Sequence, residues 1–234
     1  MKIIGISGKK QSGKNTFANF VNGSILDQYG LVDSFTVNQD GLLEVKTENI
    51  HGKKGWGILD VTRKDKEFCD YALENVWPFV KVYHFADYLK KICVDLFDLT
   101  SEQVYGTDKD KNTPTPYDGK TSREFLQWFG TDIMRSIKDS IWVDYTIKQI
   151  KQEQSAVSLI PDVRFPNEVK AIKEAGGCVV RLTREAYASE HHCETALDSN
   201  NFDWKEFDYI IDNHDMSIEQ LGLEIEKIKQ VWSI

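Results

Sequence analysis

The sequence has few cysteines, no long hydrophobic run and no excess of positive charge, and each absence argues against a class of protein. Its four cysteines contain no CxxC pair, which disfavours a zinc knuckle or a redox dithiol and favours reduced thiols in a cytosolic compartment. No stretch approaches the roughly 20 apolar residues that span a membrane, and the apolar N-terminal run is too short for a signal peptide. We therefore expect a cytoplasmic protein with no membrane partner.

Net charge limits the partners further. The 234 residues include 29 Lys and Arg against 37 Asp and Glu, a formal net charge of −8. A protein that grips a nucleic-acid backbone needs a basic stripe to displace counterions, and the sequence supplies none. We expect no nucleic-acid partner, and any anionic ligand must be bound by a few local cations working against the global field.

Apolar segments with strand character alternate with segments of helical periodicity along most of the chain. At this length, the alternation predicts one α/β domain over 1–234 with three layers, in which helices cover both faces of a mainly parallel sheet of about five strands. The expected strands are 2–7, 79–85, 156–161, 179–183 and 209–212. The expected helices are 14–22, 86–97, 121–137, 142–154, 166–175 and 217–232.

The region from about 32 to 77 breaks this alternation and is interpreted as an insertion. Two segments, Ser34–Val37 and Leu42–Thr47, flank a turn-forming stretch and predict a small β-hairpin. Three glycines between 52 and 57 predict a loop, and a polar helix is expected over 64–75. A further loop is expected outside the insertion, over 108–119, where two prolines and many polar residues gather.

Residues 8–14 read Gly-Lys-Lys-Gln-Ser-Gly-Lys, a GxxxxGK motif placed after a strand and before a helix. In this context backbone N–H groups point at phosphate oxygens, and the helix N-terminus adds partial positive charge. Lys14 is expected to reach the β- and γ-phosphates. Asn15 stands where the full pattern has the Ser or Thr that binds magnesium, and Thr16 follows it. The expected phosphate-donor-binding residues of this loop are Gly8, Lys10, Ser12, Gly13, Lys14, Asn15 and Thr16.

The apolar strand over 156–161 leads into Asp162, beside the expected place of the phosphate loop. A strand-end aspartate at that place holds Mg²⁺ directly or through water. The next residue is Val163 and not the glutamate that water-activating ATPases often carry, which favours transfer to a bound acceptor over hydrolysis. The alternative is that Asp162 is a turn or cap residue.

Only six basic residues are arginines, and three of them, Arg123, Arg164 and Arg184, come at a helix start or just after a strand. That rim is where α/β folds bind ligands, and the planar fork of arginine suits bidentate contact with phosphate. Arg123, Gln127 and Thr131 are spaced by four and therefore stay near one face of an α-helix. The alternative for this face is a solvated surface with salt bridges.

Two other features receive a structural interpretation. Arg181 lies inside an expected strand. The run His191-His192-Cys193-Glu194 could suggest a metal site, but adjacent histidines on an extended segment point to opposite faces, and no further ligand cluster accompanies them. We therefore expect no metal bound by this run.

Six short motifs follow one another in an order that is more specific than any one of them. They are the phosphate loop at 8–16, FADYLK at 85–90, SREFLQ at 122–127 with GTD at 130–132, DVRFPNE at 162–168, ETALD at 194–198 and DN at 212–213. In this combination the chain resembles the bacteriophage deoxynucleoside monophosphate kinases, which belong to the nucleoside monophosphate kinase group of phosphate-loop (P-loop) proteins. The resemblance covers residues 1–22 and the chain from 83 onward.

The resemblance implies a P-loop kinase fold and the ATP-dependent, Mg²⁺-dependent phosphorylation of a deoxynucleoside monophosphate to the diphosphate. The partners it implies are small-molecule nucleotides, with a homodimer as the assembly to test and the host cytoplasm as the location of a phage-encoded enzyme. The acceptor is already a phosphate oxyanion, so catalysis needs positioning and charge neutralisation, and no general base. By position, the implied catalytic residues are Lys14, Asp162 and Arg164, the further donor-binding residues are Arg184 and Asn213, and the acceptor-binding residues are Asp87, Lys90, Arg123, Gln127, Thr131 and Glu194.

The chain also departs from the family pattern. The 32–77 region has no role that the resemblance supplies, and Cys193 stands where the family has a serine, within a lid-like segment at about 185–200. In such kinases the residue after the loop lysine is often not Ser or Thr, which accommodates Asn15.

Two alternative functions stay open. Animal-type phosphomevalonate kinases are similar at the phosphate loop and near the C-terminus. A P-loop ATPase or nucleotide-sensing module is the other alternative, and it predicts a water-activating acid and a partner surface, for which the insertion is the candidate.

Overall fold

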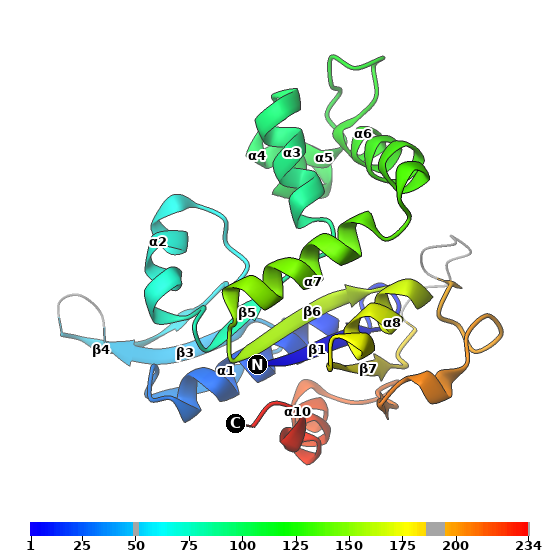
Figure 1. Cartoon of the computed structure of the whole chain (residues 1–234). Helices are drawn as coiled ribbons and strands as arrows, with labels where there is room; N and C mark the ends of the chain where they lie inside the picture. Colours follow the sequence, from blue (N-terminus) through cyan, green and yellow to red (C-terminus); the bar gives the residue numbers. More distant parts are fainter. Residues whose placement is uncertain (49–51, 186–194, 234) are drawn as a thin grey trace. The chain divides into compact units, whose positions relative to one another are not determined.

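The computed structural model describes residues 1–48, 52–185 and 195–233 of the chain (Figure 1). The chain forms two compact units. We call Met1–Tyr83 together with Ile150–Ile234 the sheet unit, and His84–Gln149 the helical unit. Each unit is described by itself.

A five-stranded parallel sheet forms the centre of the sheet unit, in the order β5–β6–β1–β7–β8. Its neighbouring strands all run parallel, and almost every residue of β1, β6 and β7 is buried, as expected when both faces of a sheet are covered. The predicted mainly parallel sheet is confirmed. The strands are β1 (Lys2–Ser7), β5 (Val80–Val82), β6 (Val157–Val163), β7 (Cys178–Leu182) and β8 (Tyr209–Ile211).

Helices cover both faces of the central strand β1. Ile4 and Ile6 belong to a core that also contains Trp232 and buried residues of α1 and α10. Gly5 faces the other way, where a Cβ would lie 2.7 Å from Ile172 of α8. Since side chains alternate along a strand, α8 lies on the opposite face from α1 and α10, and the predicted three layers are confirmed. The helices concerned are α1 (Lys14–Gln28), α8 (Pro166–Glu174) and α10 (Ile218–Lys227), followed by a short 3₁₀ turn (Lys229–Val231) where a continuous helix to 232 was predicted.

The predicted insertion contains a second sheet and one helix. The expected hairpin is present as β2 and β3, but the prediction of a loop over 52–57 is wrong, because Lys54–Ile58 forms a third antiparallel strand beside β3. Gly55 and Gly57 alternate with Trp56 and Ile58, and this glycine content hid the period-two pattern of a strand. The elements are β2 (Ser34–Val37), β3 (Leu43–Glu48), β4 (Lys54–Ile58) and α2 (Lys66–Asn75).

The insertion packs on α1, and this contact explains why α1 is longer than predicted. A Cβ on Gly23 would overlap the ring of Phe35, and the Phe35 ring also meets Phe20 edge-on at 5.6 Å. Gly23 therefore serves a close approach of β2 to the helix and does not end it. The prediction that the helix ends near Asn22 is wrong, since α1 continues to Gln28.

The helical unit is a set of short helices around an aromatic cluster. Phe97 meets Tyr117, Phe125 and Phe129 at ring-centroid distances of 5.7, 5.1 and 5.0 Å. The predicted loop over 108–119 begins with a four-residue helix, because Thr107 and Asp110 form a capping box at its start. The elements are α3 (Asp87–Phe97), α4 (Ser101–Tyr105), α5 (Asp108–Lys111), α6 (Ser122–Gln127), a π-helix (Trp128–Arg135) and most of α7 (Ile141–Glu153).

The helix predicted over 121–137 changes type along its length. Thr121 and Glu124 form the predicted capping box, so α6 begins where the sequence indicates. From Trp128 the hydrogen bonds become π-helical, and the prediction of one α-helix is wrong there. Gly130 lies in this segment, where a Cβ would overlap Leu89 and where its carbonyl accepts a bond from the Trp142 indole at 2.9 Å.

Within the described ranges, every helix is too short or too polar to cross a membrane.

Candidate active site

The loop over residues 8–13 joins the end of β1 to the start of α1. Steric constraints explain why glycine occupies both of its ends. Gly13 caps α1 with a φ of +96°, a left-handed conformation that favours glycine. A Cβ on Gly8 would overlap the Ser12 hydroxyl and would lie 3.1 Å from the Leu182 carbonyl oxygen of β7. The loop is further tied by a bond from the Ser12 N–H to the Lys9 carbonyl at 3.2 Å. The strand–loop–helix arrangement that the motif predicts is present.

The loop offers positive groups and an unmet polar atom to an anion. The Lys14 ammonium donates to the carbonyls of Gly8 and Lys9 at 2.8 and 2.6 Å, so it lies over the first half of the loop. The Ser12 hydroxyl oxygen is buried and makes no hydrogen bond within the described residues. A cradle at a helix N-terminus that holds an ammonium group and a spare hydroxyl fits a phosphate group.

Asn213, which follows the edge strand β8, supports the loop, and Arg184, which follows β7, contacts Asn213. The buried Asn213 amide donates to the Ser12 carbonyl at 2.8 Å, and its oxygen accepts from the Arg184 N–H at 2.9 Å. The Arg184 guanidinium donates to the carbonyls of Asn213, at 3.0 Å, and of Met216. Of the two predicted donor-site residues, Asn213 thus contacts the loop directly, and Arg184 contacts Asn213.

Asp162 and Arg164 lie where β6 meets the end of β1. The strand was predicted to end at Pro161, but it continues to Val163, with an irregular register opposite Gly5–Ser7 of β1. Asp162 is therefore a residue of the strand's last segment beside the start of the phosphate loop. It is partly exposed, and so is Arg164.

Glu168 shapes the turn that carries Arg164, and sequence reasoning missed it. Its buried carboxylate accepts from the backbone N–H groups of Arg164 and Phe165 at 2.7 and 3.0 Å. These bonds fix the turn at the start of α8. The signal was present, because Glu168 stands at the third position of a helix that opens with Pro166, but the usual Ser or Thr partner of a capping box is replaced by Phe165.

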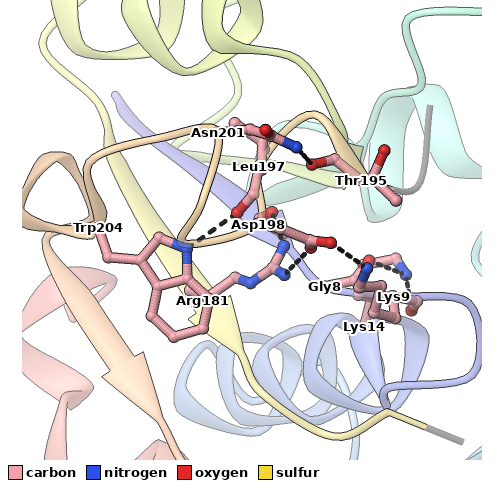
Figure 2. A network of polar contacts seen from close by, with 10 residues as sticks. Gly8, Lys9, Lys14, Arg181, Thr195, Leu197, Asp198, Asn201 and Trp204 are labelled. Atoms are coloured by element: carbon pink, nitrogen blue, oxygen red, sulfur yellow. Dashed lines mark hydrogen bonds and ion pairs between the residues drawn. The ribbon is translucent and has the colours of Figure 1, made fainter. Parts of the chain in front are cut away.

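A second missed group joins the loop to a later segment of the chain (Figure 2). The Lys9 ammonium contacts the Asp198 carboxylate at 2.6 Å, and the side chain of Lys9 is 8% exposed. Arg181 of β7, 4% exposed, donates to the Ser7 hydroxyl at 3.0 Å and lies 3.6 Å from Asp198. Lys9 occupies a variable position of the motif and Asp198 lies 189 positions away, so no local pattern connects them.

The hairpin turn of the insertion lies against the first turns of α1. A Cβ on Gly41, whose φ is +77°, would lie 2.5 Å from the Thr16 hydroxyl. Asn19 donates to the Gly41 carbonyl at 2.8 Å. Asn38 makes the turn rigid by accepting from the N–H groups of Asp40 and Leu42. The insertion therefore contacts the candidate donor-site residue Thr16.

Five predicted acceptor-binding residues lie in the helical unit. Asp87 lies 3.7 Å from the His84 ring nitrogen at the start of α3, and the Lys90 ammonium lies 5.0 Å from the centroid of the Tyr105 ring. Burial, together with the charge of Asp87, raises the pKa of Tyr105 to about 12. Arg123 at the start of α6 contacts Asp108 at 2.6 Å. The other two residues are Gln127 and Thr131, and both are exposed.

The predicted common face of Arg123, Gln127 and Thr131 spans a change of helix type. Arg123 and Gln127 lie in α6, and Thr131 lies in the π-helix. A spacing of four residues is close to one turn in either type of helix, so the common face stays a prediction.

The remaining predicted residue, Glu194, lies outside the described residues, as does the run His191-His192-Cys193. Among the residues that the structure describes, no group of three or more His, Cys, Asp or Glu side chains is arranged to hold a metal ion.

A parallel sheet whose central strand leads through a glycine-bounded phosphate loop into a helix defines the P-loop kinase class of α/β folds. A family model described as deoxynucleotide monophosphate kinase matches residues 2–225. A protein of Acanthamoeba polyphaga mimivirus named "Putative deoxynucleotide monophosphate kinase" is 37% identical over 159 residues, which cover 60% of this chain and 78% of that protein. The chain belongs to the deoxynucleotide monophosphate kinase family. It is a phosphotransferase with a nucleotide kinase function, and the family indicated by the motifs is confirmed.

Proposed function

We propose that this protein transfers the γ-phosphoryl group of ATP to a deoxynucleoside 5′-monophosphate and forms the diphosphate. The proposal rests on the loop of residues 8–13, which together with Lys14 forms a cradle suited to an anion. The chain that carries this loop belongs to the deoxynucleotide monophosphate kinase family. Family membership favours this reaction over phosphomevalonate phosphorylation and over a nucleotide-sensing module.

The residues around the loop suit a donor triphosphate with Mg²⁺. Asp162 lies at the carboxyl end of β6 beside β1, and a single carboxylate is enough where phosphates and waters supply the other ligands. When bound, Mg²⁺ supplies charge neutralisation between donor and acceptor phosphates. Lys14 adds a positive charge at the loop, and Arg164 follows Asp162 on a turn fixed by Glu168.

We assign acceptor binding to the helical unit. Arg123 is half-exposed at a helix start, and its described partner Asp108 is more exposed still, so the guanidinium can exchange this surface carboxylate for a phosphate. Gln127 lies one turn further on the same helix and offers an amide to the base or sugar. Asp87, Lys90 and Thr131 complete the assignment. The acceptor phosphate is the nucleophile, so these residues position it and do not remove a proton.

An ATP-coupled assay across all deoxynucleoside and ribonucleoside monophosphates, with phosphomevalonate and acceptor-free reactions alongside, tests the proposal. We expect ATP consumption only in the presence of at least one deoxynucleoside monophosphate. Turnover with phosphomevalonate as the only accepted substrate would show that the proposed substrate class is wrong. Steady ATP consumption without any acceptor would show that the protein is an ATPase and not a kinase.

A magnesium titration tests the role of Asp162. Asp162→Asn should raise the Mg²⁺ concentration at half-maximal rate and lower kcat by about tenfold or more. The reason is that Mg²⁺, which neutralises the negative charge on the phosphates in the transition state, would be bound less tightly. Asp27→Asn on α1, an exposed site with the same charge change, is the matched control. If Asp162→Asn kept both values of the parent, only a structural role would be left for this carboxylate.

A single kinase domain over 1–234, a homodimer and a cytoplasmic location also belong to this proposal. So does the lid-like segment at about 185–200, of which residues 186–194 lie outside the described residues. Light scattering on the purified chain tests the dimer, and a single species at the monomer mass would rule it out.

A further inference from the structure

The loop contains a buried lysine whose ammonium group pairs with a carboxylate from a later segment of the chain. Lys9 is 7% exposed, although lysine side chains are rarely buried without a partner. Its ammonium lies 2.6 Å from Asp198, and it lies on the side of the loop that faces residues 195–204 (Figure 2). A buried charge of this kind is stable only when it is paired, so the partner carboxylate is required.

Asp198 serves a second buried cation as well. The Arg181 guanidinium lies 3.6 Å from its other carboxylate oxygen and 5.3 Å from the centroid of the Trp204 ring. One carboxylate therefore faces two cations that are both almost excluded from water. Removal of one member of a buried ionic group lowers the stability of the fold by more than the loss of a surface ion pair, because a charge without a partner stays buried.

The carboxylate is held in place by its own segment. Asp198 lies in a turn in which its N–H donates to the Thr195 carbonyl at 3.0 Å, and the Asn201 side chain donates to the same carbonyl at 2.9 Å. The Trp204 indole donates to the Leu197 carbonyl at 2.9 Å, and Leu197 is 2% exposed. The position of Asp198 is thus fixed before any ligand arrives.

The contact continues to the candidate catalytic lysine. Asp198 holds Lys9, and the Lys9 carbonyl accepts from the Lys14 ammonium at 2.6 Å together with the neighbouring Gly8 carbonyl. Arg181 holds Ser7, the last residue of β1 before the loop. The first half of the loop is therefore anchored from one side by a group that lies far away in the sequence.

We propose that Asp198 is a positioning residue for the phosphate loop, which acts through Lys9 to hold the loop backbone and Lys14 in the geometry that binds the donor phosphates. This inference rests on the proposed function of the loop. Backbone amides bind a phosphate well only when they are held within a fraction of an ångström of their final positions. Loss of the anchor should weaken donor binding and leave acceptor binding unchanged.

The test compares Asp198→Asn with Asp203→Asn, an exposed aspartate of the same segment and the same charge change. We expect Asp198→Asn to weaken binding of a non-hydrolysable ATP analogue by about tenfold or more and to raise the KM for ATP, with the acceptor KM unchanged. Asp203→Asn should match the parent. A merely structural role would lower the folded fraction without changing the affinity of the folded protein.

A double-mutant cycle with Lys9→Met then tests the route through Lys9. The loss of analogue affinity in the double variant should be close to that of either single variant, because both remove one contact. Asp198→Glu, which retains the charge, should recover part of the affinity and serves if Asp198→Asn does not fold. Parental affinity in folded Asp198→Asn, or additive losses in the cycle, would overturn the proposal. Analogue binding needs no acceptor, so this result is independent of whether the deoxynucleoside monophosphate assay succeeds.

Discussion

The phosphate loop and the predicted acceptor residues of the helical unit are built in opposite ways. Around the loop, Lys9, Ser12 and Asn213 are buried, and much of the binding surface is backbone held by other segments. In the helical unit, Arg123 and Gln127 are exposed side chains on a short helix. Surface ion pairs contribute little to stability. A change near the loop should therefore disturb several groups together, whereas a change in the helical unit should remove one contact.

The largest effect is expected for Lys14→Ala. Phosphoryl transfer should fall by more than about a hundredfold, because no other group replaces the ammonium charge beside the transferred phosphate. The thermal unfolding midpoint should change little, since Lys14 contacts two carbonyls at the loop surface. Lys66→Ala, an exposed lysine of α2 that has no proposed role in binding, is the comparison and should match the parent. Residual activity above about one part in a hundred would show that Lys14 does not hold the phosphates.

Gly41→Ala tests whether the hairpin turn between β2 and β3 influences the phosphate loop. The left-handed backbone should cost about 1–2 kcal/mol of unfolding free energy, and the Cβ would also press on Thr16 at 2.5 Å. Gly30→Ala is a matched control, since its φ of +67° is similar but no atom lies within 4 Å of the Cβ. Denaturant unfolding and the KM for ATP are measured for both. Equal losses of stability and an equal KM for ATP would show that the turn does not influence the loop.

Arg123→Lys tests the helical side. The KM for the acceptor should rise by about tenfold, because a point charge cannot replace a bidentate fork, and the KM for ATP should be unchanged. Arg63→Lys, an exposed arginine that makes a bidentate pair with Asp65, controls for the loss of a surface pair. A parental acceptor KM in Arg123→Lys would make Arg123 a surface residue.

The smallest effect concerns the start of α6. Hydrogen bonds from the backbone and the hydroxyl of Thr121 hold the pKa of Glu124 below its ordinary value of 4.5. A carboxyl whose pKa is lower in the folded state stabilises the fold above its unfolded pKa, and this contribution is lost as pH falls below about 4.5 through the folded pKa. Glu124→Gln should therefore lower the melting midpoint slightly at pH 7, and the difference should shrink at pH 3. A difference that grew on acidification would contradict this sign.

Local patterns were enough for the sheet and the phosphate loop. The strands of the central sheet are short apolar runs, and the loop has glycines at a fixed spacing, so both are visible in a few adjacent residues. The strand β4 was missed because Gly55 and Gly57 weaken the same signal. The π-helix was missed because the spacing of apolar residues does not reveal a change of hydrogen-bond pattern, and the contacts of Gly130 with Leu89 and Trp142 are visible only in the structure.

The site shows the same limit. Lys14, Asn213 and Asp162 could be assigned to the loop region from motifs, although their roles in binding stay predictions. The pairing of Lys9 with Asp198 could not, because it depends on how a late segment returns to the first loop. Arg181 was interpreted as structural, and its burial agrees with that interpretation. Its contact with Asp198 could not be predicted from the sequence.

The order of the strands has a consequence for how the chain is made. The central strand β1 is synthesised early, yet Lys2 pairs with Val157, 155 positions later, and Ile4 pairs with Cys178. Sheets with such distant pairings form slowly, and their apolar strands are prone to aggregation as long as they stay unpaired. Among the residues that the structure describes, the inserted strands pair only with one another, and they pack on α1 through Phe20 and Phe35. The insertion is thus synthesised before both neighbours of β1, so an apolar partner for the first helix is available before the central sheet can form.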